Sequence, residues 1–317
     1  MKNKETLTVL FLVFFVCNIF ALGNKETAGA GEVLYSLPQQ NQMQSSTVES
    51  RAEQIMKSLT NAYPLQIESV EFRNDDWAVL LRDTWYYYCD GKLLPQNLIS
   101  NSSNYSPQPF LSNYPAELPQ WEKPGQEESL RFLNMTNNRN QNPPRRSPLF
   151  FDDLWRAHNQ GEAYERVKTI RFLGKPVTVH YLVMENLALV EEHILAAART
   201  EPQVQVWVDN ISSLEGWSWR NIADTQSRSY HSYGLAIDII PKSYGGKDTY
   251  WLWTSRYRQD WWNVSYNERF HPPAAVIKAF EKFGFIWGGK WLYFDTMHFE
   301  YRPEILILSG MPPETQR

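Results

Sequence analysis

The stretch Ser-Tyr-His-Ser-Tyr-Gly-Leu-Ala-Ile-Asp, from Ser229 to Asp238, contains an imidazole at His231 and ends on a carboxylate, with one glycine between them. Ile237 to Ile240 is predicted as a short buried strand within a run that is otherwise apolar from Leu235, and Gly234 permits a tight turn that returns His231 toward Asp238. A buried carboxylate without a cation or hydrogen bonds is costly. The pattern therefore predicts a positive group beside Asp238.

A second stretch, Asp-Thr-Met-His-Phe-Glu from Asp295 to Glu300, supplies another imidazole, His298, between two carboxylates. Zinc readily takes neutral imidazole nitrogen and carboxylate oxygen, and catalytic zinc sites use three protein ligands so that water fills the fourth position. His231, Asp238 and His298 are the candidate ligands of one Zn2+ ion. The sequence thus predicts a zinc site that keeps one position open.

Together the two patterns, S-x-H-x-x-G-x-A-x-D and D-x-x-H-F-E, resemble those of the zinc D-Ala-D-Ala carboxypeptidase and L-alanyl-D-glutamate endopeptidase family of the bacterial cell wall, to which the Hedgehog signalling domain is related. The resemblance covers residues 207–303, about a third of the chain. It implies an α+β fold of the Hedgehog/DD-peptidase type, with a small central antiparallel sheet flanked by helices. It also implies hydrolysis of peptide bonds in peptidoglycan stem peptides.

Peptide hydrolysis at such a site needs an acceptor for the proton of the attacking water and a positive group for the developing oxyanion. Asp295 is the preferred base, because it lies three positions before His298 and the resemblance implies an acidic residue there. Glu300 is the rival, since strand alternation puts positions 298 and 300 on the same face. At that position Glu300 is also suited to orient a metal ligand instead of acting as the base.

The resemblance implies that Arg220, which follows an aromatic residue, stabilises the oxyanion, and its guanidinium stays charged in any protein setting. Arg228 is closer to His231 in sequence and is the alternative to Arg220 in this role. If either arginine has no catalytic role, it is expected to form a surface salt bridge. Ser229 is expected to make a supporting hydrogen bond, because serine triads are built from separate segments. His271, before two prolines, is expected at a helix boundary.

The N-terminus combines two lysines, an apolar run and a small-residue site, which predicts a signal peptide over residues 1–23. Residues 24–49 are polar and predict a disordered tether. The expected location is therefore outside the cytoplasm, in the periplasm or cell envelope. An uncleaved apolar run, or lipid attachment at Cys17, would make a membrane tether. After cleavage only Cys89 is left, so no internal disulfide is expected.

The rest of the chain divides by composition into three parts. Residues 50–94 predict an N-terminal accessory α/β region, with one helix followed by a small antiparallel β unit. Residues 95–149 are dense in Pro and Asn and predict a linker or a strap lying over a neighbour. Residues 150–310 are the expected zinc peptidase domain, within which Val204 to Val208 is predicted as a strand.

The formal net charge of −4 over 317 residues gives no reason to expect nucleic acid as a partner. The leading hypothesis is an exported zinc metallopeptidase acting on peptidoglycan stem peptides, as a D-Ala-D-Ala carboxypeptidase or an L-Ala-D-Glu endopeptidase. A second hypothesis is a wall-binding module that keeps the zinc and does not cleave peptides. The acidic residue Asp295 argues against this hypothesis. A third is a serine hydrolase using Ser229.

Overall fold

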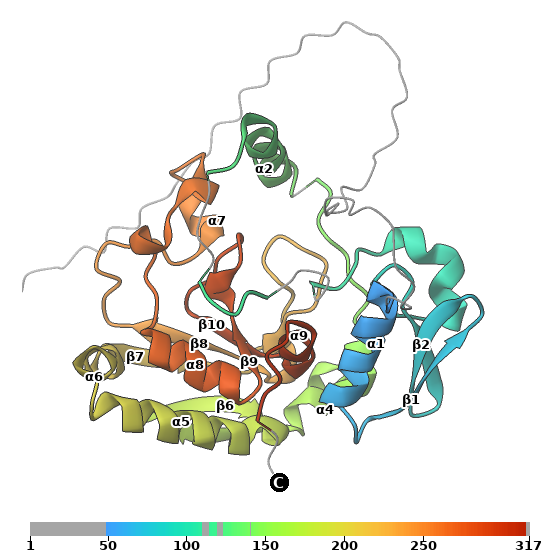
Figure 1. The fold of residues 1–317 in the computed structure, drawn as a ribbon, viewed down its shortest axis with the longest axis horizontal. Helices are drawn as coiled ribbons and strands as arrows, with labels where there is room; N and C mark the ends of the chain where they lie inside the picture. The colour runs from blue at the N-terminus through green and yellow to red at the C-terminus, as the bar shows by residue number, and fades with distance from the viewer. Residues whose placement is uncertain (1–48, 110–113, 119–122, 140, 315–317) are drawn as a thin grey trace, which may run out of the picture. The chain divides into compact units, whose positions relative to one another are not determined.

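The structure is a computed structural model, and it describes residues 49–109, 114–118, 123–139 and 141–314 (Figure 1). The predicted signal peptide and the predicted tether up to residue 48 lie outside the described residues. Within the described ranges, no helix is both long and apolar enough to cross a membrane.

The sheet at the centre of the C-terminal part has four antiparallel strands in the order β7-β8-β10-β9 (Figure 1). The bounds are Ile211–Glu215 for β7, Ala236–Pro241 for β8, Phe285–Trp287 for β9 and His298–Tyr301 for β10. Helix α8 (Ala274–Lys282) packs on one face, where Phe280 stacks on Phe299 with ring centroids 3.8 Å apart. Helix α5 (Met184–Ala198) lies beside α8. This antiparallel sheet with helices against it is compatible with the predicted α+β class.

The N-terminal region begins with helix α1 (Arg51–Ala62), which buries Ile55, Met56 and Leu59 on one side, as their helical spacing predicts. A second antiparallel sheet follows in chain order, with β1 at Ile67–Arg73, β2 at Asp76–Leu81, β3 at Thr84–Tyr87 and β4 at Leu94–Pro95. Helix α1 packs against α9 (Pro303–Leu308) at the opposite end of the described chain. One hydrophobic core therefore includes residues of both regions.

The described parts of the Pro-rich segment include η1 (Gln96–Asn104), which lies against β3 and β4, and α2 (Gln126–Asn138). Residues between these two helices contact the C-terminal part. Tyr114 is 2% exposed, and its hydroxyl donates to Glu281 and accepts from the backbone of Trp287. Lys290 Nζ donates to the carbonyl oxygens of residues 115 and 116. These contacts fasten the segment beside strand β9.

The prediction of a strand over Val204 to Val208 is wrong, because these residues belong to helix α6 (Pro202–Asp209). The buried side chains of α6 are Val204 and Trp207, which are three positions apart, while Val206 is 68% exposed. Helical spacing therefore decides which side is buried. Proline in the first turn is compatible with a helix start, because no intrahelical acceptor is available there.

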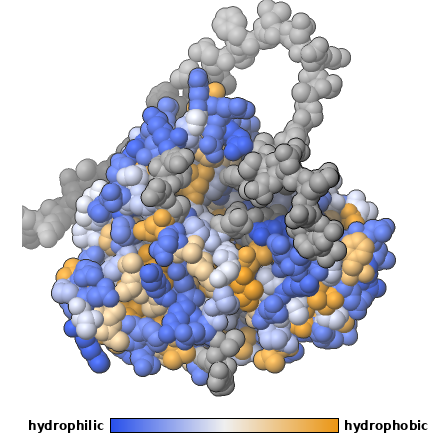
Figure 2. Space-filling view, in the orientation of Figure 1, coloured by the Kyte–Doolittle hydropathy of each residue, from blue (hydrophilic) through white to orange (hydrophobic). Residues whose placement is uncertain are grey.

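The remaining helices and strands are short. They are α3 (Leu149–Trp155), α4 (Gln160–Tyr164), the hairpin of β5 (Val167–Phe172) and β6 (Lys175–His180), η3 (Tyr181–Val183), η4 (Tyr230–Tyr233), α7 (Trp251–Thr254), η5 (Trp261–Asn263), η6 (Tyr266–Glu268) and η7 (Gly288–Lys290). A separate aromatic cluster joins α2, through Phe132, to Trp251, Trp261 and Trp262. On the face shown in Figure 2, hydrophobic residues form small patches between hydrophilic ones.

Candidate metal centre

The short helix η4 places His231. Ser229 caps this helix, and its Oγ accepts a hydrogen bond from the His231 backbone N–H at 3.3 Å. Gly234 ends the helix in the left-handed region, with φ of 71°, and a Cβ there would lie 2.7 Å from the backbone nitrogen of His180. Only glycine satisfies both conditions without strain. The turn therefore returns the chain into β8 with His231 close to that strand.

The register of strands β8 and β10 brings the other two candidate ligands together. His298 is paired directly with Asp238 across the antiparallel ladder. One ligand atom from each of His231, Asp238 and His298 lies within 4.8 Å of the others. His231 is buried, whereas the side chains of Asp238 and His298 are 15% and 16% exposed. The cluster is thus closed on the His231 side and partly open to solvent on the other.

The contacts of His231 fit a metal ion. Its Nδ1–H donates to the carbonyl oxygen of Gly216 at 2.6 Å, which leaves the lone pair of Nε2 directed at Asp238 Oδ2, 3.2 Å away. This second contact is close enough for an ion pair but is not a hydrogen bond, and Nε2 has no hydrogen-bond partner among the described residues. Two acceptors that face each other in this way, one buried and one mostly so, need a cation between them.

Gly216 itself is required for this contact. A Cβ at position 216 would lie 2.1 Å from the carbonyl oxygen of Thr178, so any side chain would push the strand away. The backbone of the next residue, Trp217, donates to that same carbonyl at 2.7 Å. Close approach of these two segments therefore fixes the Gly216 carbonyl and, through it, the orientation of the His231 ring.

His298 lies between two carboxylates. Its Nδ1 is 2.8 Å from Asp238 Oδ1, and its Nε2 is 3.0 Å from Glu300 Oε2. Burial alone would lower the pKa of His298, but the hydrogen bonds to both carboxylates raise it well above its usual value in the metal-free protein. If a metal replaces the proton on Nδ1, the Nε2–H still donates to Glu300. This is the arrangement that orients zinc-bound histidines.

A chain of buried contacts leads from Glu300 to the N-terminal region. Arg302 Nη1 donates to Glu300 Oε1 at 2.8 Å, and Arg302 Nε donates to Glu304 Oε1 at 2.5 Å. The hydroxyl of Tyr63, directly after α1, donates to Glu304 Oε2 at 2.5 Å. Arg302, Glu304 and Tyr63 are 0%, 1% and 3% exposed. Glu300, which accepts from His298, is therefore held in turn by a buried network that ends at Tyr63, beside helix α1.

Asp295 lies in the loop that enters β10, where its backbone N–H donates to the carbonyl of Gly288 at 3.1 Å. Burial and the nearby charge of Asp238 raise the pKa of Asp295 to about 6 in the metal-free protein. Its Oδ1 is buried and accepts no hydrogen bond from the described residues. A carboxyl group with an unused oxygen is suited to take and return a proton.

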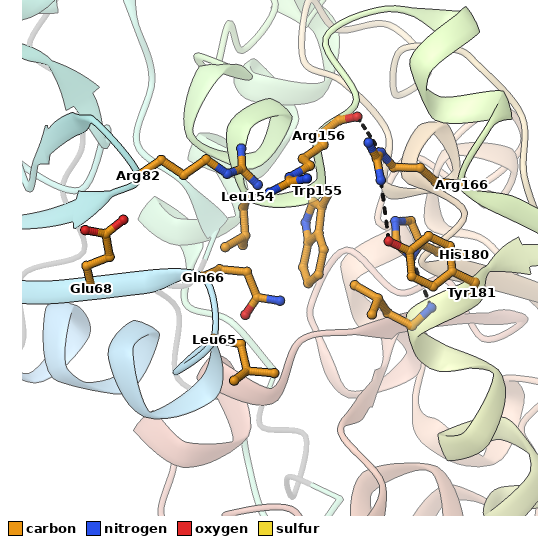
Figure 3. Close-up of a pocket in the computed structure, with 11 residues that line it drawn as sticks. Leu65, Gln66, Glu68, Arg82, Leu154, Trp155, Arg156, Arg166, His180 and Tyr181 are labelled. Atoms are coloured by element: carbon orange, nitrogen blue, oxygen red, sulfur yellow. Dashed lines mark hydrogen bonds between the residues drawn. The ribbon is translucent and has the colours of Figure 1, made fainter.

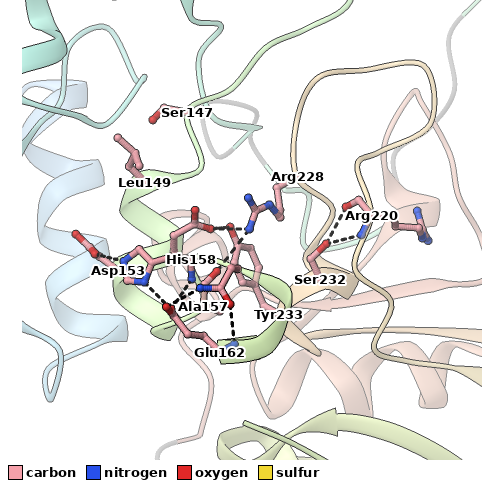
Figure 4. A network of polar contacts seen from close by, with 12 residues as sticks. Ser147, Leu149, Asp153, Ala157, His158, Glu162, Arg220, Arg228, Ser232 and Tyr233 are labelled. Atoms are coloured by element: carbon pink, nitrogen blue, oxygen red, sulfur yellow. Dashed lines mark hydrogen bonds and ion pairs between the residues drawn. The ribbon is translucent and has the colours of Figure 1, made fainter. Parts of the chain in front are cut away.

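Arg228 and Arg220 differ in what surrounds them. Arg228 Nη1 donates to Asp152 Oδ1 at 3.2 Å, and its guanidinium lies over the ring of Trp219, so this arginine is engaged in a structural ion pair (Figure 4). Arg220 is exposed, and its side chain points away from that network (Figure 4). Only the backbone of Arg220 contacts Ser232. The guanidinium of Arg220 is therefore free to meet a ligand.

Tyr250 lies beside Asp295 and is affected by the charge of Arg220. Residue 250 forms an isolated bridge with Asp295. Burial first, and then the charge of Asp295, raise the pKa of Tyr250 to about 12, while the charge of Arg139 and, more weakly, that of Arg220 oppose this shift. Arg220 and Asp295 thus act on the same phenol. Tyr250 belongs to the Gly- and aromatic-rich segment after β8 and was not among the residues that the sequence patterns identified.

Two other residues considered from the sequence lie outside the candidate ligand set. The Oγ of Ser229 accepts the His231 backbone N–H, while the His231 ring contacts Gly216 and Asp238, so no serine-imidazole pair is formed. His271 Nδ1 contacts the carbonyl oxygen of Pro272, and His271 is not part of the ligand cluster. The cluster found among the described residues consists of the three side chains that the sequence identified.

Residues 223–301 match the model of a family described as D-alanyl-D-alanine carboxypeptidase. The match includes His231, Asp238, His298 and Asp295, and Arg220 lies just outside it. It supports a peptidase domain in the C-terminal part of the chain, in agreement with the sequence patterns. Residues 55–110 match a domain of unknown function. No curated protein and no solved structure matches the chain.

Proposed function

We propose that this protein is an exported zinc metallopeptidase, with a fold of the Hedgehog/DD-peptidase type, that hydrolyses peptide bonds in peptidoglycan stem peptides. The observation that carries the proposal is the convergence of His231, Asp238 and His298 to within 4.8 Å. All three lie within the segment that matches the carboxypeptidase family. Two imidazoles and one carboxylate are a donor set typical of catalytic zinc, and the partly exposed side of the cluster leaves room for substrate.

A bound zinc ion would supply Lewis-acid activation of water and of the scissile carbonyl. The protein's own part is to hold the ligands and to move protons. The Gly216 carbonyl fixes the His231 ring through Nδ1–H, and Glu300 fixes the His298 ring through Nε2–H. Both rings then present one lone pair to the same point.

Asp295 is the proposed general base. It takes the proton of the attacking water and passes it to the leaving amine, which suits a carboxyl group whose buried Oδ1 accepts no hydrogen bond from the described residues. Glu300 is less suited to this role, because its two oxygens already accept hydrogen bonds from His298 and Arg302. The position of Glu300 instead supports a role in orienting His298.

Arg220 is the proposed partner of the developing oxyanion. Its guanidinium is exposed, has no side-chain partner among the described residues, and acts on the same tyrosine as Asp295. A guanidinium also recognises carboxylates through two parallel hydrogen bonds. Arg220 could therefore bind the terminal carboxylate of a stem peptide when the enzyme acts as a carboxypeptidase.

The test is digestion of defined muropeptides by purified protein, with the products identified by mass spectrometry. Release of D-alanine would identify a carboxypeptidase, and a cut after L-alanine would identify an endopeptidase. We expect His231→Ala to lose both zinc and cleavage, and we expect the control His271→Ala to keep both. Full zinc occupancy in the unmodified protein without any cleavage would favour a wall-binding module. Undiminished hydrolysis by His231→Ala would reject the metal role.

A further inference from the structure

A pocket with a volume of 440 Å³ lies away from the metal centre, where the N-terminal region meets the rest of the described chain (Figure 3). None of the candidate zinc ligands lines it. Its walls include the guanidinium-bearing residues Arg82, Arg156 and Arg166, and Glu68 is the acidic residue among the lining side chains. The pocket thus combines three positive charges with one negative charge.

Arg156 and Arg166 are close enough to affect Arg82. Figure 3 shows the side chains of Arg82 and Arg156 extending toward each other across the pocket. Burial first, and then the positive charges of Arg156 and Arg166, lower the pKa of Arg82, while Asp153 opposes this shift. Like charges that converge in this way repel one another unless an anion lies between them.

Neighbouring carbonyl groups hold two of the guanidinium groups in place. Arg82 Nη1 donates to the carbonyl oxygen of Asp153 at 2.6 Å, and Arg166 Nε donates to the carbonyl oxygen of Arg156 at 2.8 Å. Some of the remaining N–H groups of Arg82 and Arg166 are available for a ligand. The Arg156 side chain has no partner among the described residues. The carboxylate of Asp153 is occupied elsewhere, by Tyr86 and His158.

The local backbone determines where two of these arginines stand. Arg82 and Arg156 have φ of 55° and 52°, in the left-handed region. Arg82 lies in the turn that joins β2 to β3, and Arg156 is the C-cap of α3, so both conformations belong to chain reversals. Both side chains line the same pocket.

We infer that this pocket binds the phosphate group of a phosphoester. Guanidinium groups match phosphate oxygens through paired, charge-assisted hydrogen bonds, and several of them together suit an oxyanion of more than one charge. The volume exceeds that of a phosphate alone, and Leu65, Tyr181 and Leu182 offer exposed apolar surface at its walls, where they are 93%, 41% and 45% exposed. The organic part of the ligand lies against this surface.

The test uses the full chain and two phosphoester probes, with glycerol phosphate as a soluble probe and phosphatidylglycerol vesicles as a membrane probe. Calorimetry measures the first and co-sedimentation the second, against phosphatidylcholine vesicles. We expect at least one probe to bind, and we expect Arg82→Gln and Arg156→Gln to weaken that binding about tenfold or more, as loss of a charge-assisted contact implies. The control Arg199→Gln removes an exposed positive charge outside the pocket and should bind like the unmodified protein.

Two outcomes would overturn the inference: no binding of either probe, or equal binding by the pocket variants and the control. Binding only to vesicles would identify the ligand as a phospholipid. Binding to both probes would indicate that the pocket accepts phosphoesters in general.

The variant Arg156→Gly distinguishes a ligand-binding role of this arginine from a structural role. It should lose binding while its thermal midpoint stays the same or rises, because glycine accepts the left-handed backbone. A lowered midpoint would indicate that Arg156 is structural. Zinc content and peptide hydrolysis are not part of either readout, so the proposed function stands or falls separately.

Discussion

Replacing Glu300 with glutamine tests how the structure orients His298. Glu300 accepts from His298 Nε2 at 3.0 Å and from Arg302 Nη1 at 2.8 Å. Glutamine keeps the shape but offers one acceptor oxygen, so its amide group must face either the His298 or the Arg302 N–H. Losing such an outer partner costs roughly 10- to 100-fold in metal affinity. This corresponds to about 1.4 to 2.7 kcal/mol of binding free energy.

The assay is competition for zinc between the protein and a chromophoric chelator, with thermal melting to confirm that Glu300→Gln is folded. Glu192→Gln, an exposed position on α5, is the matched control and should keep the zinc Kd of the unmodified protein. At saturating zinc, kcat of Glu300→Gln should largely recover, because Asp295 is intact. An unchanged Kd in a folded Glu300→Gln protein, or a kcat that stays lost at saturating zinc, would refute the assignment.

Three further predictions follow from the same contacts. Asp295→Asn should keep zinc but lower kcat about 100- to 10,000-fold, the usual worth of a general base, as measured with muropeptides at saturating zinc. Tyr63→Phe removes a buried hydrogen bond to the carboxylate of Glu304 and should lower the free energy of unfolding by about 1.5 to 3 kcal/mol in urea titrations. His158→Asn should destabilise the protein at acidic pH and much less at alkaline pH in thermal melts. Hydrogen bonds to Asp153 and Glu162 raise the pKa of His158, so its contribution is fully present below about pH 6.5 and is lost as pH rises through the raised value.

Each of these predictions has an opposite outcome. Rapid hydrolysis by zinc-loaded Asp295→Asn would transfer the role of base to another group. Unchanged stability of Tyr63→Phe would mean that the buried chain from helix α1 to Glu304 contributes nothing measurable. An effect of His158→Asn that is equal at acidic and alkaline pH would show that the charged imidazole is not what joins Asp153 to Glu162.

The ligand set could be predicted from the sequence because each half of it is local. Gly234 and the apolar run after it predict a turn and a strand, and the structure has both. The pairing of Asp238 with His298 could not be predicted, because strand register depends on tertiary packing. The contact of Tyr63 with Glu304 joins residues 241 positions apart, and no local pattern indicates it.

Two secondary-structure elements show where local patterns fail. Helix α6 has the composition of a strand, and only its contacts decide that Val204 and Trp207 are buried together. Strand β7 was not predicted, because Ile211 and Leu214 are its buried residues and do not alternate. An irregularity in the pairing with β8, between residues 211 and 213, accounts for this spacing. At α6 and β7, tertiary contacts therefore override the secondary structure that the spacing of apolar residues predicts.

The most direct test of the central claim is to measure zinc content and stem-peptide hydrolysis on the same samples while zinc is removed and then restored stepwise. We expect one zinc per chain at full activity, a hydrolysis rate proportional to zinc occupancy, and neither zinc nor hydrolysis in His298→Ala. Hydrolysis that continues after complete removal of zinc, or a fully loaded protein that releases no new amino groups from the peptide, would contradict the claim.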